Sequence, residues 1–86
     1  MEKKLSGWIK PSNLNGKIND AYDLGQEIKK RRKKLGYTQV QLAKACKCSP
    51  RFIGEVERGI AGGNIKQVLN ICHSIGIDIY AKPRGE

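Results

Sequence analysis

The stretch TQVQLAKACKCSPRFIGEVERG, from Thr38 to Gly59, carries most of the information about the fold of this chain. It has the pattern of two short helices joined by a tight corner, an arrangement typical of proteins that bind nucleic acid. It also contains Cys46 and Cys48, two of the three cysteines of the chain, in a Cys-x-Cys step that raises the question of a bound metal.

Helix start signals mark both helices of this stretch. Thr38 with Gln41 has the spacing of a capping box, and Ser49 followed by Pro50 combines a cap with a proline at the first helical position. These signals predict one helix that begins after Thr38 and a second that begins after Ser49.

The two predicted helices also meet the packing demands of a helix-turn-helix motif. Ala43 is small enough for close contact where the helices cross, and Ile53 with Val56 gives the second helix a branched inward pair. The helix starts then direct N–H groups outward, where they can hold phosphates. The positions of the second helix left for DNA are Arg51, Phe52, Gly54 and Glu55.

Two further helices are predicted around this motif. The first begins at its cap Asp20 and ends before Gly36; the second begins at its cap Asn64, after the loop GIAGGN, and ends at Gly76. Each has apolar residues at helical spacing. These are Leu24, Ile28 and Leu35 in the first helix and Ile65, Val68, Leu69, Cys72 and Ile75 in the second.

The chain divides into three predicted parts: an N-terminal arm at 1–19, a helix-turn-helix domain at 20–76, and a C-terminal dimerisation strand and tail at 77–86. The tail IDIYAK alternates apolar and polar residues, which predicts one short strand. A lone strand in a helical domain needs a partner, and the same strand of a second copy supplies one. We therefore expect a homodimer whose pairing residues are Ile77, Ile79, Tyr80 and Ala81.

The charge of the chain points to a polyanionic partner. It has 17 Lys and Arg against 8 Asp and Glu, a formal net charge of +9. Nucleic acid is favoured over a membrane because no long apolar run is present. The run KKRRKK at Lys29–Lys34 is by itself typical of a solvated helix face, with phosphate contacts or a targeting signal as alternatives. The odd cysteine count and the absence of a signal peptide pattern favour the cytoplasm.

The cysteines and the single histidine do not have the spacing of a structural zinc site. Such a site commonly uses two Cys-x2–4-Cys pairs, whereas Cys46-x-Cys48 and Cys72-His73 are spaced differently. We expect the cysteines to act as small core residues and predict neither a metal nor a cofactor. The chain also lacks a Ser-His-Asp set, a phosphate-binding glycine loop and an evident carboxylate pair, so we do not expect an enzyme.

The segment LGQEIKKRRKKLGYTQVQLAKACKCSPRFIGEVERG resembles the Xre family of helix-turn-helix regulators, which includes the lambdoid phage repressors. The motifs are G-Y-T-Q-x-x-L-A at Gly36–Ala43 and I-x-x-[LV]-E-x-G at Ile53–Gly59. The resemblance implies an all-α, lambda-repressor-like domain of four to five helices. Together with VLNICHSIGIDI, the segment is similar to the HipB-like antitoxins, in which a short C-terminal strand pairs across a homodimer.

The resemblance implies roles for individual residues. Gln39 matches a glutamine that contacts backbone phosphate and often a base; Arg51 is placed for guanine O6 and N7, and Glu55 for cytosine N4. Phe52 has two interpretations, contact with a thymine methyl group or packing between helices. The expected DNA-binding residues are Thr38, Gln39, Lys47, Ser49, Pro50, Arg51, Phe52, Glu55 and Arg58.

Two matches are structural and two positions depart from the family. Arg32 and Glu57 match an ion pair that joins the first helix to the recognition helix. Lys47 stands where the family has a left-handed glycine, at a cost of about 1 kcal/mol, and Gly54 lies inside a helix at a similar cost. Close approach to DNA and neutral drift are alternative reasons for Gly54.

The resemblance implies a sequence-specific, DNA-binding transcriptional repressor in the bacterial cytoplasm, associated with the nucleoid. A homodimer is expected on an inverted repeat in double-stranded DNA. The narrower similarity implies the antitoxin of a type II toxin-antitoxin operon, which represses its own operon and neutralises a HipA-like serine/threonine kinase. A stand-alone or phage-type repressor without a toxin partner is the alternative.

Overall fold

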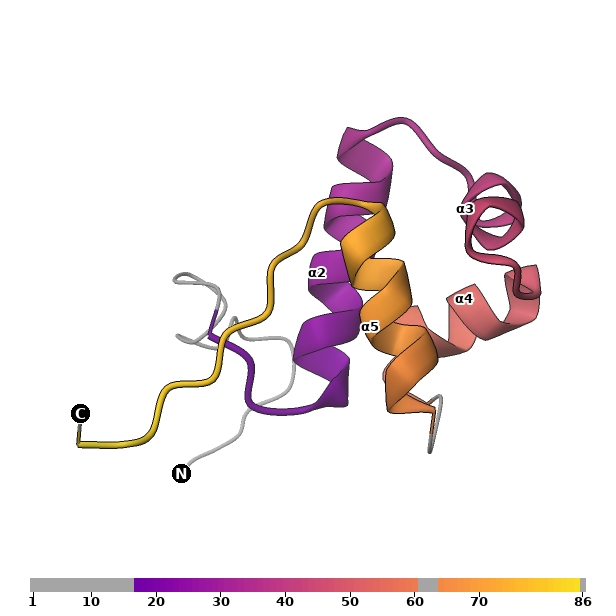
Figure 1. Ribbon diagram of the computed structural model, residues 1–86. Coiled ribbons are helices and arrows are strands. Elements are labelled where there is room, and N and C mark those ends of the chain that lie inside the picture. The colour runs from indigo at the N-terminus through magenta and orange to yellow at the C-terminus, as the bar shows by residue number, and fades with distance from the viewer. Residues whose placement is uncertain (1–16, 61–63, 86) are drawn as a thin grey trace, which may run out of the picture.

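The structure, a computed structural model, describes residues 17–60 and 64–85 (Figure 1). These residues form four helices: α2 (Ala21–Lys34), α3 (Gln39–Cys46), α4 (Pro50–Glu57) and α5 (Ile65–Ser74). The predicted all-α class is therefore confirmed for the described part. Residues 1–16 of the predicted arm and 61–63 of the predicted loop lie outside it.

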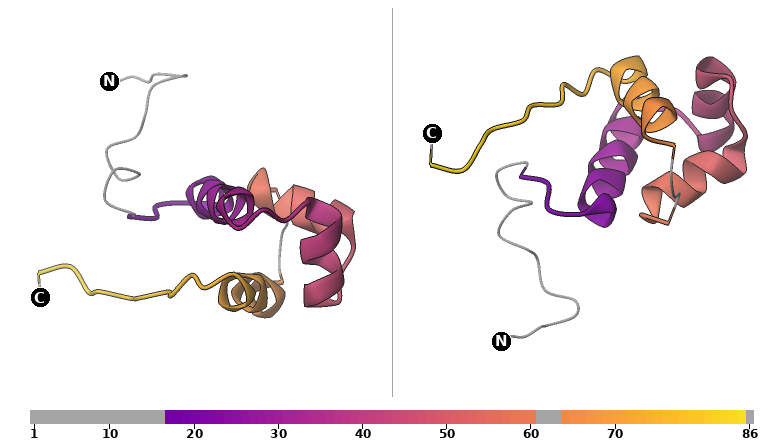
Figure 2. Two further views of the ribbon diagram at one scale, coloured as in Figure 1. Left: turned by 90° about the horizontal axis from the view of Figure 1, so that it is seen from above. Right: turned by 60° about the horizontal axis from the view of Figure 1, so that its bottom comes forward.

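The helix α4 lies at the centre of the packing. It packs against α2 on one side and against α3 on the other, while α5 packs against α3. Figures 1 and 2 show α3 and α4 together at one end of the molecule, with the C-terminal segment after α5 leading away from them.

Each helix begins where the sequence predicts, because a polar side chain accepts a hydrogen bond from a first-turn N–H group. At α3 both halves of the capping box are present: the Gln41 N–H donates to Thr38 Oγ1 at 3.0 Å, and the Thr38 N–H donates to Gln41 Oε1 at 2.8 Å. At α4 the Phe52 N–H donates to Ser49 Oγ at 3.0 Å. The other two caps are Asp20 for α2 and Asn64 for α5.

The core consists of small and branched side chains from all four helices and from the residue after α5. Its buried members are Ile28, Leu42, Ala43, Cys46, Ile53, Val56, Ile71, Cys72 and Ile75. Cys46 and Cys72 are thus core residues, as expected. Leu35, in contrast, is exposed and caps α2 instead of joining the core.

The predicted C-terminal strand is not present. Residues 77–83 follow α5 without helix or strand, because a strand needs a hydrogen-bonded neighbour and the described part of the chain offers none here. Ile77 is anchored: its N–H donates to the Cys72 carbonyl at 2.8 Å, and its side chain packs against the core. Ile79, Tyr80 and Ala81 are exposed, with Tyr80 at 87%.

Gly25 sets the closest approach of α2 to α4. A Cβ atom at this position would overlap the carbonyl oxygen of Val56 and lie 2.7 Å from the carbonyl oxygen of Glu57. Both atoms belong to the backbone of α4 and cannot rotate away. The absence of a side chain at Gly25 therefore allows the two helices to pack at this distance.

Two alanine substitutions provide a matched test of this contact. Both Gly25 and Gly54 lie inside helices, where Ala is favoured over Gly by about 1 kcal/mol. A Cβ at Gly54 would meet no atom closer than 3.4 Å, so we expect Gly54→Ala to raise the free energy of unfolding by up to ~1 kcal/mol. Gly25→Ala should lower it by ~1–3 kcal/mol because α2 and α4 must separate.

Urea unfolding followed by circular dichroism measures both changes. A Gly25→Ala protein as stable as Gly54→Ala would contradict the close contact.

Candidate nucleic-acid interface

The corner between α3 and α4 is closed by Lys47 in the left-handed conformation, with φ 58° and ψ 45°. Among the described residues it is the one non-glycine residue with positive φ. The Cys48 N–H donates to the Ala43 carbonyl at 3.0 Å, which turns the chain toward the cap Ser49. The left-handed corner expected at Lys47 is therefore present, and its lysine side chain is exposed.

The helix α4 has an inward and an outward face, as the motif requires. Ile53 and Val56 are buried in the core, at 0% and 5% exposure. Arg51, Glu55 and Arg58 follow one another at helical spacing on the other side, and the Arg51 side chain is 87% exposed. A duplex placed against this face would meet two guanidinium groups and one carboxylate.

Two of the four positions expected to face DNA are partly or fully covered by the protein itself. Phe52 is half-buried and packs against the core, which agrees with the packing interpretation of this residue. Gly54 is buried, not outward: a Cβ atom added there would lie nearest to Arg58 Nη1 and to the amide of Gln39. Because the Gln39 side chain reaches across from α3, Gly54 is covered by the protein itself.

The two helix starts differ in the N–H donors they offer. At α3 the N–H groups of Gln39 and Val40 precede the first intrahelical bond and are available to an anion. At α4 the first position is Pro50, which has no N–H group, and the Phe52 N–H is used by Ser49. The start of α3 is therefore the better phosphate site of the two.

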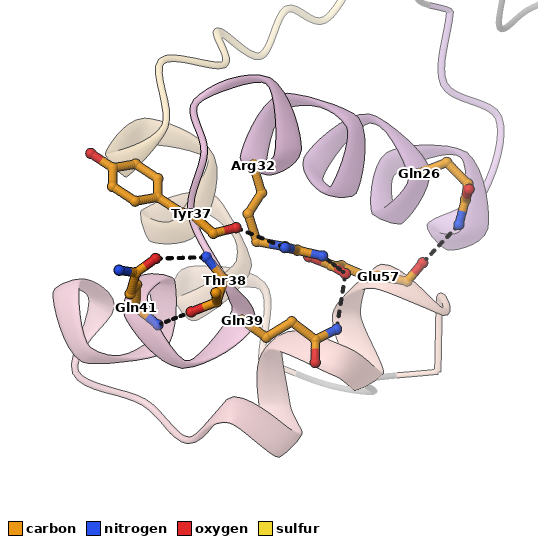
Figure 3. Close-up of polar contacts among 7 residues, drawn as sticks. All are labelled: Gln26, Arg32, Tyr37, Thr38, Gln39, Gln41 and Glu57. Carbon is orange, nitrogen blue, oxygen red and sulfur yellow. Dashed lines mark hydrogen bonds and ion pairs between the residues drawn. The ribbon is translucent and has the colours of Figure 1, made fainter.

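A buried ion pair between α2 and α4 lies beneath this surface (Figure 3). Arg32 Nε donates to Glu57 Oε2 at 2.6 Å and Arg32 Nη2 donates to Glu57 Oε1 at 3.1 Å, which is a bidentate contact. The Arg32 and Glu57 side chains are 8% and 3% exposed. The pair expected from the sequence is present, and its burial keeps Arg32 away from bases.

Three further groups join this pair. Arg32 Nη1 donates to the Tyr37 carbonyl at 2.8 Å, and Gln39 Nε2 donates to Glu57 Oε1 at 3.1 Å. Gln26 Nε2 donates to the Glu57 backbone carbonyl at 3.1 Å (Figure 3). The result is a polar network that links α2, the connection to α3, α3 itself and the end of α4. Gln39 therefore contacts the network as well as lying at the surface.

The basic run at Lys29–Lys34 is not a uniform surface. Arg32 is buried, and Arg31 Nε donates to the Ile75 carbonyl at 2.7 Å, so both arginines hold the fold together. The exposed cations of the run are Lys30, Lys33 and Lys34.

Sequence reasoning missed Gln26, Gly25 and the Arg31–Ile75 contact. Gly25, Gln26 and Arg31 lie in the segment that carries the family resemblance, but outside the two motifs quoted for it, and nothing in the sequence indicated their partners.

The cysteines do not form a metal centre in the described part of the chain. Burial raises the pKa of the Cys72 thiol, and burial together with Cys46 raises the pKa of the Cys48 thiol. Among residues 17–60 and 64–85, no group of three or more His, Cys, Asp and Glu side chains comes together.

The corner, the exposed face of α4 and the capped start of α3 together define a helix-turn-helix DNA-binding domain. A family model described as "Helix-turn-helix" (HTH_3) matches residues 28–80, more than half of the chain. The chain belongs to this Xre-like helix-turn-helix family and is a DNA-binding transcription regulator. The search of curated proteins found no match to it. None of the helices in the described ranges has the length and apolar character needed to cross a membrane.

The two Arg–Glu pairs of the domain allow a controlled test of the buried network. Arg32→Met leaves the Glu57 carboxylate buried without its partner, so we expect a loss of ~3–5 kcal/mol in the free energy of unfolding. Arg51→Met breaks the exposed pair with Glu55, whose atoms lie 3.1 Å apart, and should cost less than ~1 kcal/mol. Denaturant midpoints of the two variants give the comparison; similar losses would show that burial is not the deciding factor.

Proposed function

We propose that this chain is a transcriptional repressor that reads an inverted repeat in double-stranded DNA as a homodimer. The observation that carries the proposal is the exposed face of α4, where the Arg51 side chain is 87% exposed while Ile53 and Val56 hold the helix to the core. This helix enters the major groove in the proposed complex, and the start of α3 contacts the adjacent phosphates.

Each expected contact residue has a role in this complex. Arg51 donates to guanine, and Gln39 contacts phosphate through the amide N–H that Glu57 does not use. Phe52 contributes chiefly by packing. The phosphate contacts come from Thr38, Lys47, Ser49 and Arg58, and Pro50, which has no N–H group, adds apolar contact beside them. All five are exposed in the free protein and close to the corner or to the ends of α3 and α4.

Base readout and phosphate contact respond differently to mutation. Arg51→Ala should weaken discrimination at one base pair by ~1–3 kcal/mol. Lys34→Ala, which removes an exposed cation at the end of α2, should weaken binding to all sequences alike and lower the salt slope by about 1.

Selection of binding sites from random duplexes, followed by fluorescence anisotropy at several salt concentrations, separates the two effects. The proposal fails if the unmodified protein binds its selected site no better than random DNA.

The proposed dimer forms through the C-terminal segment. Beyond Ile77, whose N–H donates to the Cys72 carbonyl, residues 78–82 have no hydrogen-bonded neighbour in the described part of the chain, and Ile79 and Tyr80 are exposed. Pairing with the same segment of a second copy would supply the missing partners and form the predicted strand. Two α4 helices then lie about one helical turn of DNA apart, ~34 Å.

A truncation after Asp78 tests the dimer without disturbing the core. It keeps Ile77, which packs against the core, and removes Ile79, Tyr80 and Ala81. We expect a folded monomer by sedimentation velocity at concentrations where the full chain is a dimer. An unchanged sedimentation coefficient would contradict pairing through this segment.

We further propose that the repressor is the antitoxin of a HipBA-like operon in the bacterial cytoplasm and nucleoid, with a HipA-like serine/threonine kinase as its partner. The support is the similarity of the α2–α5 sequence and the following segment to HipB-like antitoxins. A kinase-like reading frame beside the gene, whose product co-purifies with this chain, is the expected finding. A phage cassette in that place would favour a phage-type repressor.

A further inference from the structure

The outward face of α4 combines positive charge with one carboxylate. Arg51, Glu55 and Arg58 are spaced at i, i+4 and i+7, so they share one side of the helix. Arg51 Nε donates to Glu55 Oε2 at 3.1 Å, and the Glu55 side chain is 29% exposed. An acid in the middle of a face that approaches phosphates requires an explanation, because it lowers affinity for any DNA.

Stability does not provide that explanation. An exposed ion pair at i, i+4 contributes little to folding because solvent screens it. Glu55 also differs in position from the other acids of the described residues. Asp20 and Asp23 lie at the start of α2, Glu27 lies farther along α2 beside the C-terminal segment, Glu57 is buried, and Asp78 follows α5.

We propose that Glu55 is a specificity-determining residue that penalises incorrect DNA sequences. The inference rests on the proposed function and deepens it. In the free protein Arg51 compensates the Glu55 charge. When Arg51 turns to a guanine, Glu55 loses part of this contact and faces the major groove, where its carboxylate needs a hydrogen-bond donor.

The chemistry of the major groove sets which sequence supplies that donor. Cytosine N4 donates, whereas guanine O6 and N7 and thymine O4 accept and would repel a carboxylate. Adenine N6 donates but has the acceptor N7 beside it, an edge that suits an amide better than a carboxylate. The pair Arg51–Glu55 therefore selects a guanine with a neighbouring cytosine, and the penalty at other sequences contributes to specificity.

A charge-matched pair of variants tests this role. Glu55→Gln and Glu27→Gln each remove one negative charge from a chain of net charge +9, and Glu27 lies on α2, outside the α4 face. Dissociation constants are measured by anisotropy for the duplex selected by the unmodified protein and for a scrambled duplex of equal length. Thermal unfolding of each variant confirms that it is folded.

We expect Glu55→Gln to bind scrambled DNA about tenfold more tightly and to lose about tenfold in the ratio of selected to scrambled affinity. Glu27→Gln should change both duplexes by the same small factor, because it alters only the overall charge. If Glu55→Gln also shifts both duplexes equally, Glu55 is part of the bulk charge and the inference is overturned. If the unmodified protein shows no preference between the duplexes, the proposed function itself fails, which is a separate outcome.

A second measurement separates Glu55 from Arg51. In an Arg51→Ala background the Glu55 carboxylate has lost its compensating cation, so Glu55→Gln should still tighten binding to scrambled DNA by about tenfold. Loss of this effect in that background would show that Glu55 acts only by holding Arg51, and would overturn the specificity role.

Discussion

The buried contact between Arg32 and Glu57 is the interaction on which the arrangement of this domain depends. Its two hydrogen bonds join α2 to the end of α4, and Tyr37 and Gln39 extend it to the start of α3 (Figure 3). Because charges are costly to bury, such a pair is stable only in one geometry in which each charge keeps its partner. The pair thus fixes the position of α4 relative to the start of α3, the second element that is proposed to contact DNA.

The backbone of α2 and α4 makes this geometry attainable. Gly25 brings the two helices together, and Gln26 bonds the Glu57 carbonyl near the same place. Gly54, in contrast, leaves room for a Cβ atom, and the Gln39 amide and the Arg58 side chain lie nearest that position. The side chains proposed to contact DNA are therefore held in place by contacts between helices, so that packing and the proposed recognition depend on the same few residues.

Much of the fold was predictable because its signals are local. The caps Thr38 and Ser49 and the left-handed corner at Lys47 depend on residues a few positions apart, and all three are present. Gly25 and the Arg31–Ile75 bond were not predictable, because their meaning depends on segments distant in sequence. The burial of Gly54 was not predictable for the same reason, because the Gln39 side chain that lies over it belongs to another helix. The strand predicted at residues 77–82 is absent from the single chain because no other described segment supplies its hydrogen bonds.

The bond from Arg31 to the carbonyl of Ile75 has a consequence for assembly. It ties α2 to the point where the chain leaves α5, and the Ile77 amide is fixed to Cys72 just beyond. The beginning of the C-terminal segment, at residues 75–77, thus has a fixed orientation relative to α4, the helix proposed to enter the major groove. If two copies pair through these segments, the distance between their two α4 helices would be fixed. The dimer would then bind weakly to operators in which the spacing between the half-sites is longer or shorter by a single base pair.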